Sequence, residues 1–214
     1  MTHPLDPLFN PRGVAVIGAS NRELTIGHRV VTNILAYGFK GGVYPVHPKG
    51  GEVLGLKAYT SVLDIPGPVD LVNICIRNTY VPQTMEECGK KGVKFAIIHS
   101  GGFREVGGEG ARLEDEVMEI AGKYGIRVYG PNSQGVMNSD PAVNLYANFT
   151  FTPMVPGGVS ILAQSGGVAE VLNLNLRERG MGFSKYASNG NARDVSIPEI
   201  LEYFGQDEKT KVIL

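Results

Sequence analysis

The sequence predicts an α/β protein built around a doubly wound, parallel β-sheet. Three observations carry this prediction. Short apolar runs alternate with segments of helical periodicity from Val14 onward, and glycines stand where these runs end. The alternation stops after residue 138 and starts again at Val159. We therefore expect a Rossmann-like sheet followed by the beginning of a second α/β domain.

The first domain is predicted to open with residues 1–12, a proline-rich, polar segment that we expect to lie on the surface as an arm. A strand at 14–17 and a helix at 27–37 follow, and Gly38 ends that helix. The segment 53–63 is expected to be a short excursion before the third strand. The other predicted elements of this domain are strands at 43–46, 71–76, 95–98 and 127–129, and helices at 81–91 and 112–124.

A change of pattern marks the expected domain boundary. Residues 139–158 lack regular periodicity and are rich in Pro and Gly, so we assign 1–140 to the first domain and 141–158 to a linker. The second domain, 159–214, is predicted to contain strands at 159–162, 183–187 and 212–214, and helices at 168–179 and 197–204. A strand at the very end leaves one α/β layer incomplete, so we expect this chain either to be part of a longer polypeptide or to have a second half that binds elsewhere.

Composition and charge narrow the functional classes. The 214 residues carry 20 basic and 21 acidic side chains, a net charge of -1, which gives no general electrostatic reason to bind nucleic acid or a membrane surface. No apolar run approaches the ~20 residues of a membrane span, and residues 1–13 lack the order of a signal peptide. Cys75 and Cys88 make no disulfide framework, so we expect reduced thiols in a cytoplasmic protein.

The turn after the first predicted strand indicates a phosphate-bearing ligand. Strand, Gly18-Ala19-Ser20 turn and helix form the opening of a nucleotide-binding βαβ unit, in which backbone N–H groups hold a phosphate. A nicotinamide dinucleotide fits less well, because only one glycine of the usual three is present and no acid stands between Glu23 and Glu52 to hold the ribose. His47-Pro48-Lys49 occupies that position instead, and NADP remains open.

Coenzyme A satisfies these constraints better. Its diphosphate needs a backbone turn, which 18–22 supplies, and its 3′-phosphate needs a cation, for which Lys49 is the candidate. Its pantetheine arm needs a groove along strand ends, which the loops 76–78 and 99–101 can line. Lys49 also fits a solvated turn, because Pro-Lys-Gly-Gly is good turn chemistry.

Six short motifs follow one another along the chain. They are Val16-Ile17-Gly18-Ala19-Ser20, Pro45-Val46-His47-Pro48-Lys49, Gly101-Gly102-Phe103, Gly130-Pro131-Asn132-Ser133-Gln134-Gly135, Gln164-Ser165-Gly166-Gly167, and Ser188-Asn189-Gly190 leading into Ile200-Leu201-Glu202-Tyr203. Each motif alone is weak evidence. In this order, across nearly the whole chain, they resemble the NDP-forming acyl-CoA synthetase superfamily. That superfamily includes the succinyl-CoA synthetase α subunit and, more similar to this chain, the ADP-forming acetyl-CoA synthetases.

The resemblance implies a CoA-binding Rossmann-like domain followed by a flavodoxin-like domain. In the family, acid and ATP give an acyl phosphate, the phosphoryl group passes through a histidine, and CoA takes the acyl group. By position, Ser20, Asn21 and Arg22 correspond to CoA diphosphate contacts, and Lys49 corresponds to the family's lysine on CoA. The expected CoA-binding residues are, in full, Gly18, Ala19, Ser20, Asn21, Arg22, Pro48, Lys49, Ile76, Arg77, Asn78, Ile98, His99 and Ser100.

The resemblance also implies catalytic residues. Asn132 would lie near the CoA thiol, and Ser165, Gly166 and Gly167 resemble the helix N-terminus that receives the phosphohistidine. Free N–H groups and the helix dipole stabilise an anionic phosphoryl group at such a position. Ser165 also invites a nucleophile interpretation, but Ala163 breaks the G-x-S-x-G pattern, so the N-cap role is favoured. No residue of this chain is assigned to a metal ion.

Some parts of the family's machinery are not expected in this chain. None of its histidines (His3, His28, His47 and His99) has the sequence context of the family's phosphohistidine. An ATP-grasp domain or subunit would bind ATP or ADP with Mg²⁺, and relatives work as oligomers. We therefore expect CoA and a carboxylic acid as small-molecule partners, and we expect this chain alone to bind CoA and turn over nothing.

Several interpretations stay open from the sequence. His99 fits a general acid or base, although a strand-end histidine satisfied by the backbone is favoured, and His47 fits either a loop residue or a ligand neighbour. The charged segment 104–119 is interpreted as a solvated helix face with its preceding loop. The loop 188–194 can contact a phosphoryl group, a partner domain or only solvent. For the whole chain, the alternatives are a CoA-sensing regulatory module of a protein lysine acetyltransferase and an NADP-dependent oxidoreductase domain.

Overall fold

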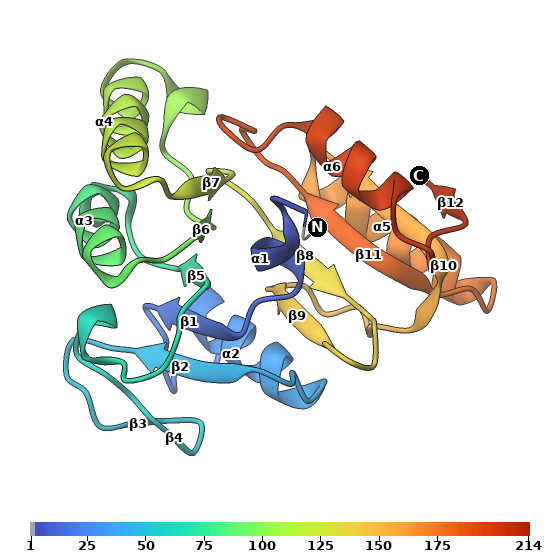
Figure 1. Cartoon of the computed structure of the whole chain (residues 1–214), viewed down its shortest axis with the longest axis horizontal. Coiled ribbons are helices and arrows are strands. Elements are labelled where there is room, and N and C mark those ends of the chain that lie inside the picture. Colours follow the sequence, from blue (N-terminus) through green and yellow to red (C-terminus); the bar gives the residue numbers. More distant parts are fainter. Residues whose placement is uncertain (1–2) are drawn as a thin grey trace.

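Two five-stranded sheets lie beside each other in the computed structural model, which describes residues 3–214 (Figure 1). α3 (Val81–Lys91) and α4 (Gly108–Tyr124) cover the outer side of the first sheet, and α5 (Gly166–Glu178) packs on the second sheet. The helices α1 (Asp6–Phe9), α2 (Ile26–Ala36) and α6 (Ile197–Gly205) pack into the hydrophobic cluster that the two sheets share. A small antiparallel hairpin, β3 (Glu52–Val53) and β4 (Leu56–Lys57), projects from the first half. The two sheets follow the two successive α/β patterns in the sequence, but the second sheet also takes in two strands that lie before residue 159, β8 (Gly135–Asn138) and β9 (Leu145–Asn148).

The first sheet is entirely parallel, with the strand order β2-β1-β5-β6-β7. Its strands are β1 (Gly13–Ile17), β2 (Gly42–Val46), β5 (Leu71–Ile74), β6 (Phe95–Ile98) and β7 (Arg127–Tyr129). The chain first winds from β1 to β2, then returns past β1 and continues through β5. This reversal defines a doubly wound sheet and leaves the carboxyl ends of all five strands at one edge.

Helices pack on both faces of the first sheet. They are α1 (Asp6–Phe9), α2 (Ile26–Ala36), α3 (Val81–Lys91) and α4 (Gly108–Tyr124), with 3-10 turns at Val62–Asp64, Asn78–Tyr80 and Arg104–Val106. α3 and α4 cover one face, where Met85 and Val117 are fully buried. Both helices end at a left-handed glycine, Gly92 and Gly125, because glycine adopts that conformation without a Cβ penalty.

The second sheet is mixed, with the order β12-β10-β11-β8-β9. Its strands are β8 (Gly135–Asn138), β9 (Leu145–Asn148), β10 (Pro156–Ala163), β11 (Phe183–Ser188) and β12 (Val212–Ile213). β10 is parallel to β11 and β12, whereas β8 and β9 run antiparallel to their neighbours. α5 (Gly166–Glu178) and α6 (Ile197–Gly205) pack into different hydrophobic clusters on this sheet. The predicted α/β class is confirmed.

The stretch 139–158, expected to be irregular, contains regular structure. β9 lies within it, and β9 pairs with β8, which precedes it in the chain. Leu145 and Ala147 join one hydrophobic cluster and Tyr146 joins another, so this strand is buried on both faces. A strand of that kind shows no simple alternation of apolar and polar residues. The expectation of an irregular stretch was therefore wrong.

The surface arm expected at 1–12 is also wrong for the residues that the structure describes. Leu5, Leu8 and Phe9 are almost completely buried, and α1 carries them into the core. The Phe9 ring stacks on Tyr203 of α6 with a centroid distance of 5.1 Å. The prolines of this segment suggested exposure, but they only set its turns, and its apolar residues connect the two halves. Residues 1 and 2 lie outside the described part.

One hydrophobic core extends through both halves of the molecule. Its residues include Val30 and Ile34 of α2, Val136 of β8 and Phe204 of α6. The buried side chain of Asn33 on α2 adds polar contacts, because its Nδ2 donates to the carbonyl of Asn148, at the end of β9, at 2.8 Å and to that of Thr150 at 3.0 Å. The two sheets are therefore packed as one body.

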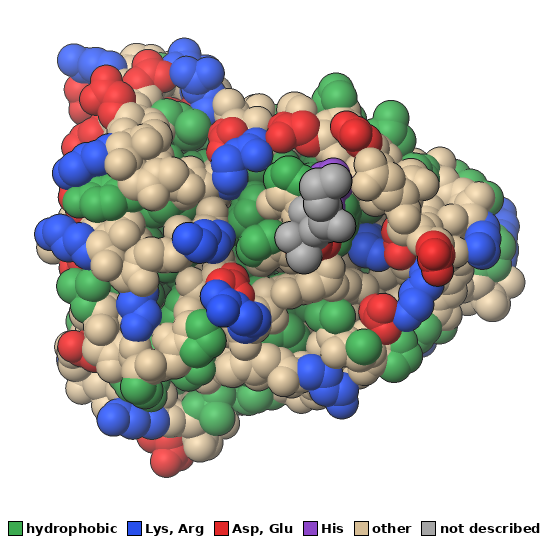
Figure 2. All heavy atoms as spheres, in the orientation of Figure 1, with side chains coloured by type: hydrophobic (Ala, Val, Ile, Leu, Met, Phe, Trp, Pro, Cys, Tyr) green, Lys and Arg blue, Asp and Glu red, His purple; other side chains and the backbone are tan. Residues whose placement is uncertain are grey.

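The structure of residues 3–214 also bears on membrane spans, metal-binding groups, surface charge and the two cysteines. In that range no helix is both long and apolar enough to cross a membrane, and no group of three or more His, Cys, Asp or Glu has a metal-binding arrangement. Figure 2 shows cationic and anionic side chains interspersed over one face of the molecule. Cys75 and Cys88 are free thiols, and burial raises the pKa of Cys88 to about 12 and that of Cys75 further.

Candidate functional site

The first expected ligand turn lies where β1 ends, beside the end of β5. Gly18 has a φ of +87°, and a Cβ at this position would stand 2.6 Å from the carbonyl oxygen of Cys75 and 2.8 Å from Cγ2 of Ile76. Only glycine combines this conformation with so close an approach. Since the winding reverses between β1 and β5, the turn lies where open α/β sheets bind their ligands.

A cavity of about 310 Å³ opens beside this turn. It is lined by Ser20, Asn21, Arg22, His47, Lys49, Gly50, Glu52 and Val53, so four predicted CoA-binding residues meet there. Local contacts fix the turn: the Ser20 hydroxyl accepts from the Arg22 N–H at 3.0 Å, and the Asn21 amide bonds to the β3–β4 hairpin. Arg22 and Lys49 are exposed and supply two cations for an anionic ligand.

The remaining predicted CoA-binding residues, apart from His99, lie along the same sheet edge but outside the lining of this cavity. They are Gly18, Ala19, Pro48, Ile76, Arg77, Asn78, Ile98 and Ser100. Ala19 and Ile98 are fully buried, so their side chains hold the strand ends in place. Asn78 joins two strand-end loops, because its Nδ2 donates to the carbonyl of Gly102 at 2.5 Å.

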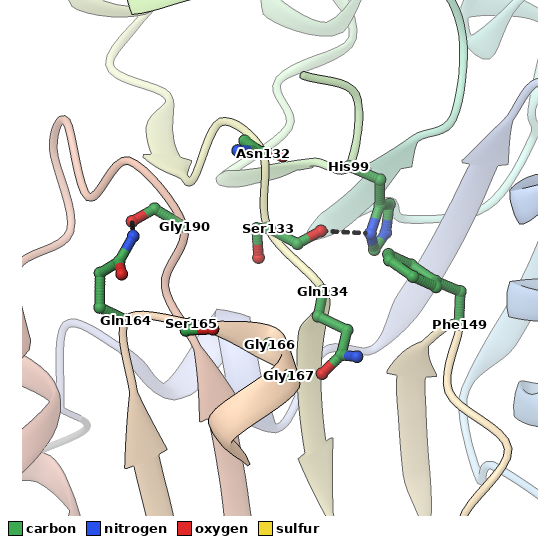
Figure 3. A pocket seen from close by; sticks show the side chains of 10 residues that line it. All are labelled: His99, Asn132, Ser133, Gln134, Phe149, Gln164, Ser165, Gly166, Gly167 and Gly190. Atoms are coloured by element: carbon green, nitrogen blue, oxygen red, sulfur yellow. Dashed lines mark hydrogen bonds between the residues drawn. The ribbon is translucent and has the colours of Figure 1, made fainter. Parts of the chain in front are cut away.

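A second cavity, also about 310 Å³, lies between the carboxyl ends of the two sheets (Figure 3). Its lining consists of His99, Asn132, Ser133, Gln134, Phe149, Gln164, Ser165, Gly166, Gly167 and Gly190. Five of these were predicted from the sequence: His99 and Asn132 from the first half, and Ser165, Gly166 and Gly167 from the second. We call this space the inter-sheet cavity. It brings the expected thiol side and the expected phosphoryl side together.

The N-terminus of α5 forms one wall of the inter-sheet cavity. Ser165 is its N-cap residue, and the Ser165 side chain makes no capping hydrogen bond. Thr25 and Ser196, in contrast, cap α2 and α6 through their side-chain oxygens. The first N–H groups of α5 are therefore available to another acceptor, and the helix dipole adds partial positive charge there. This wall suits an anion.

His99 is held by the fold on the opposite side of the cavity. Its Nδ1 lies 3.0 Å from the carbonyl oxygen of Ser133, and its Nε2 lies 2.8 Å from Oδ1 of Asn73. A carbonyl only accepts, so Nδ1 carries the proton. Two acceptors do not bond to each other, so a neutral ring needs the Asn73 amide turned to present its Nδ2, which is buried and has no other partner among residues 3–214, to Nε2. Burial lowers the pKa of His99 to about 4, against a smaller opposing effect of the Ser133 bond. The ring is therefore neutral at pH 7, and none of the ten lining side chains is charged.

Five lining residues were not predicted as site residues: Ser133, Gln134, Phe149, Gln164 and Gly190. Ser133, Gln134, Gln164 and Gly190 belong to motifs that the sequence displays, so their place beside Asn132 and Ser165 was the available signal. Phe149 lies beyond the end of β9, where no strand was expected. No local signal in the sequence could have found it, because β9 is buried on both faces and shows no alternation of apolar and polar residues.

The two halves also meet through Asn191, which follows the cavity residue Gly190 in the chain. The Asn191 side chain donates to Glu105 at 2.7 Å and to Glu114 at 3.1 Å, and Arg104 pairs with Glu114 at 2.9 Å. Glu114 is only 1% exposed, so the expectation of a solvated face over 104–119 was wrong at this residue. Burial alone would raise the pKa of Glu105, but hydrogen bonds from Asn191 and backbone N–H groups outweigh it and lower that pKa.

Gly190 allows a close approach between the two halves. Its φ is +59°, and a Cβ there would stand 2.3 Å from the carbonyl oxygen of Pro131 and 2.4 Å from that of Asn132. The N–H of Asn191 donates to Pro131 at 2.8 Å, and the Gln164 side chain donates to the Gly190 carbonyl at 2.9 Å. The loop 188–194 therefore contacts the first half of the chain directly.

Comparisons with known proteins give two successive matches. Residues 12–139 match the family described as CoA binding domain. Residues 156–214 match the family described as succinyl-CoA ligase like flavodoxin domain. The first match contains the turn at Gly18 and the loop at Asn132, and the second contains the N-terminus of α5.

Individual relatives match over nearly the whole chain. The α subunit of acetate–CoA ligase (ADP-forming) I from Pyrococcus furiosus is 43% identical over 98% of this chain and 46% of its own length. The 4-hydroxybutyrate–CoA ligase (ADP-forming) from Nitrosopumilus maritimus is 41% identical over 97% of this chain and 30% of its own length. The acetyl-coenzyme A synthetase 1 (dinucleotide forming) of Candidatus Korarchaeum cryptofilum, solved with phosphate and ADP, superposes with a TM-score of 0.92 at 39% identity over 98% of this chain and 44% of that chain. The chain thus spans less than half the length of these relatives.

Proposed function

The chain belongs to the CoA binding domain family, and from this premise we propose that it is the CoA-binding part of an ADP-forming acyl-CoA synthetase. Such an acid–thiol ligase converts acid, CoA and ATP to acyl-CoA, ADP and phosphate, reversibly. The family match of residues 156–214 and the ADP-forming relatives support the same reaction class. Neither alternative, the CoA-sensing module or the NADP-dependent oxidoreductase, gains support from these matches.

The observation that carries the proposal is the inter-sheet cavity. It places Asn132, expected near the CoA thiol, on the same cavity as the uncapped N-terminus of α5. An acyl phosphate needs both neighbours, because its phosphoryl group is anionic and its carbonyl carbon must meet the thiol sulfur. Transfer forms the thioester C–S bond, breaks the acyl C–O bond and releases phosphate. Positive dipoles fixed in advance at the phosphoryl group stabilise the charge in the transition state.

The cavity beside Gly18 is our proposed site for the phosphates of CoA. The backbone N–H groups of the turn and the N-terminal part of α2 would hold the diphosphate, with Arg22 beside it. Lys49 would hold the 3′-phosphate. The pantetheine arm would then cross the ends of β1, β5 and β6 to reach His99 and Asn132. All of these strand ends lie at one edge of the sheet, so the path needs no rearrangement.

Other parts of the reaction are assigned outside the residues of this chain. We propose that an ATP-grasp domain or subunit supplies the nucleotide site, with Mg²⁺, and that a phosphohistidine reaches the N-terminus of α5. The first sheet, within residues 1–140, serves CoA, and the second half, from residue 159, serves phosphoryl transfer. The relatives are named for acetate and 4-hydroxybutyrate, so the acyl group is left open. We further propose a cytoplasmic location and an oligomeric assembly.

A coupled assay tests this function. The protein that carries this chain is combined with its ATP-grasp module, and ADP release is measured with CoA, ATP and a series of carboxylic acids. We expect ADP and acyl-CoA to form in equal amounts and to require both the acid and CoA. Formation of AMP, or hydride transfer with NADP, would contradict the proposed reaction.

A further inference from the structure

We infer that Phe149 is the residue that selects the acyl group, because it forms the apolar wall against which the hydrocarbon part of the acid lies. This inference rests on the proposed function and adds a specificity determinant to it. Phe149 is half-buried and follows the last residue of β9, so its place in the cavity depends on a strand of the second sheet.

The chemistry of the lining singles out this side chain. Phe149 is the one hydrocarbon side chain among the ten residues that line the inter-sheet cavity, and the others are Asn, Gln, Ser, His or Gly. Figure 3 shows the ring on the His99 side of the space, with the first turn of α5 below. A carboxylate or acyl phosphate bound at Gly166 and Gly167 points its charged end at the N–H groups. Its hydrocarbon end then lies against Phe149, because contact with this ring removes apolar surface from water without taking water from a polar side chain.

The ring is held in place by its surroundings. It packs edge-to-face on the neutral His99 ring, with centroids 5.6 Å apart and an interplanar angle of 72°. The backbone on each side is fixed by Asn33, whose Nδ2 donates to the carbonyls of Asn148 and Thr150 at 2.8 and 3.0 Å. Because the ring packs on His99 and both neighbouring peptides are hydrogen-bonded, Phe149 cannot move aside for a larger ligand. It therefore discriminates between acids by their size.

The size of the cavity also favours a small occupant. Its volume of about 310 Å³ is at the lower limit of the range for ligand pockets, roughly 300–1,000 Å³. It therefore suits an acyl phosphate and the end of the pantetheine arm, with the rest of CoA outside along the sheet edge. Removing the phenyl ring enlarges the space at the acyl end alone.

The selectivity of the full protein among carboxylic acids of different size measures this role of Phe149 directly. The Phe149→Ala and Phe149→Leu variants of the full protein, with its ATP-grasp partner, are assayed for kcat/KM with acetate, butanoate and 3-phenylpropanoate. We expect Phe149→Ala to shift the ratio of kcat/KM for 3-phenylpropanoate over acetate by at least about tenfold toward the larger acid, since one methylene in an apolar pocket changes selectivity by roughly 10- to 200-fold. Phe149→Leu should give a smaller shift in the same direction. KM for CoA and ATP should not change.

Phe151 provides a matched control two residues away. Its ring is 77% exposed beneath the Arg29 guanidinium, 4.2 Å from the ring centroid, and does not line the cavity. Phe151→Ala should leave the acid ratios unchanged. Equal ratios in wild type and both Phe149 variants, with the wild type active, would refute the inference while the proposed function stands. No acyl-CoA from any acid in the wild type would refute the proposed function and this inference with it. If Phe149→Ala fails to fold, Phe149→Leu decides.

Discussion

His99 connects the chemistry of the inter-sheet cavity to the stability of the fold. The sequence left it open between a general acid or base and a histidine satisfied by the backbone. The structure shows both ring nitrogens bonded within the protein, to Ser133 and Asn73. Burial lowers the pKa of His99, so the ring stays neutral at pH 7. Because the ring is held in place, it also positions the neighbouring ring of Phe149.

The depressed pKa of His99 predicts a loss of stability in mild acid. The folded pKa is about 4, and the unfolded value is about 6.5, so between these values the unfolded chain binds the extra proton. The stabilisation is complete above pH 6.5 and is lost as the pH falls through 4, by up to roughly 3 kcal/mol. Urea unfolding of wild type and His99→Asn from pH 7.5 to 4 measures this. As the pH falls, the free energy of unfolding should decrease less steeply for the variant than for the wild type. The same pH dependence in both proteins would show that His99 does not titrate as described.

Lys49 carries the prediction that separates CoA from its close analogue. If its ammonium holds the 3′-phosphate, Lys49→Ala weakens CoA binding by about 1.5–3 kcal/mol, or roughly 10- to 150-fold. Dephospho-CoA, which lacks that phosphate, should bind wild type and variant with similar affinity. Calorimetric titration of both ligands gives the comparison. Equal losses for the two would place the 3′-phosphate elsewhere.

Among individual residues, the sequence predicted best those that adjoin glycines at strand ends. Gly18, Lys49 and Asn132 follow β1, β2 and β7 at the carboxyl edge of the first sheet, because parallel strands align their carboxyl ends, a rule that needs no tertiary detail. Ser165 follows the parallel strand β10 of the second sheet in the same way. The position of Phe149 in the cavity was not predicted, because it depends on how the second sheet packs against the first. The contact between Glu114 and Asn191 was not predicted for the same reason.

At the scale of elements, the helices were predicted more accurately than the strands of the second sheet. α3 and α4 have apolar residues at helical spacing and end at glycines, both local signals. β8 and β9 carry no such signal, because both of their faces are buried and the prolines around them suggested a linker. Their pairing with β11 is set by the rest of the sheet.

The loop after β11 supports the inter-sheet cavity through Gly190. Gly190→Ala would place a Cβ against the carbonyls of Pro131 and Asn132, in addition to the cost of a left-handed alanine. Gly180→Ala is the matched control, because Gly180 has a φ of +69° with open space around it. We expect Gly190→Ala to lower the free energy of unfolding by roughly 2 kcal/mol more than Gly180→Ala.

Ligand affinity provides the second measurement for these two glycine variants. Gly190→Ala should also weaken CoA binding, since the loop of Asn132 must move to admit the new methyl group. Gly180→Ala should retain the wild-type affinity for CoA. Equal destabilisation by the two substitutions, measured by urea unfolding, would mean that this contact between the halves does not exist.

At the scale of the whole molecule, the two α/β halves share one core. α1, α2 and α6 contribute to the same hydrophobic cluster, and Asn33 and the Glu105–Asn191 contact add polar connections between the halves. The sequence predicted two successive α/β units but gave no sign of this shared interior. The shared core fixes the position of the α5 N-terminus relative to Asn132. The proposed chemistry depends on that spacing.

The carboxyl edge of the first sheet is the proposed CoA site of this chain. Calorimetric titration of the 214-residue chain with CoA, with NADP as the control ligand, tests this site. We expect one CoA to bind per chain in the micromolar range and NADP not to bind. Binding of NADP without CoA, or of neither ligand, would contradict this assignment.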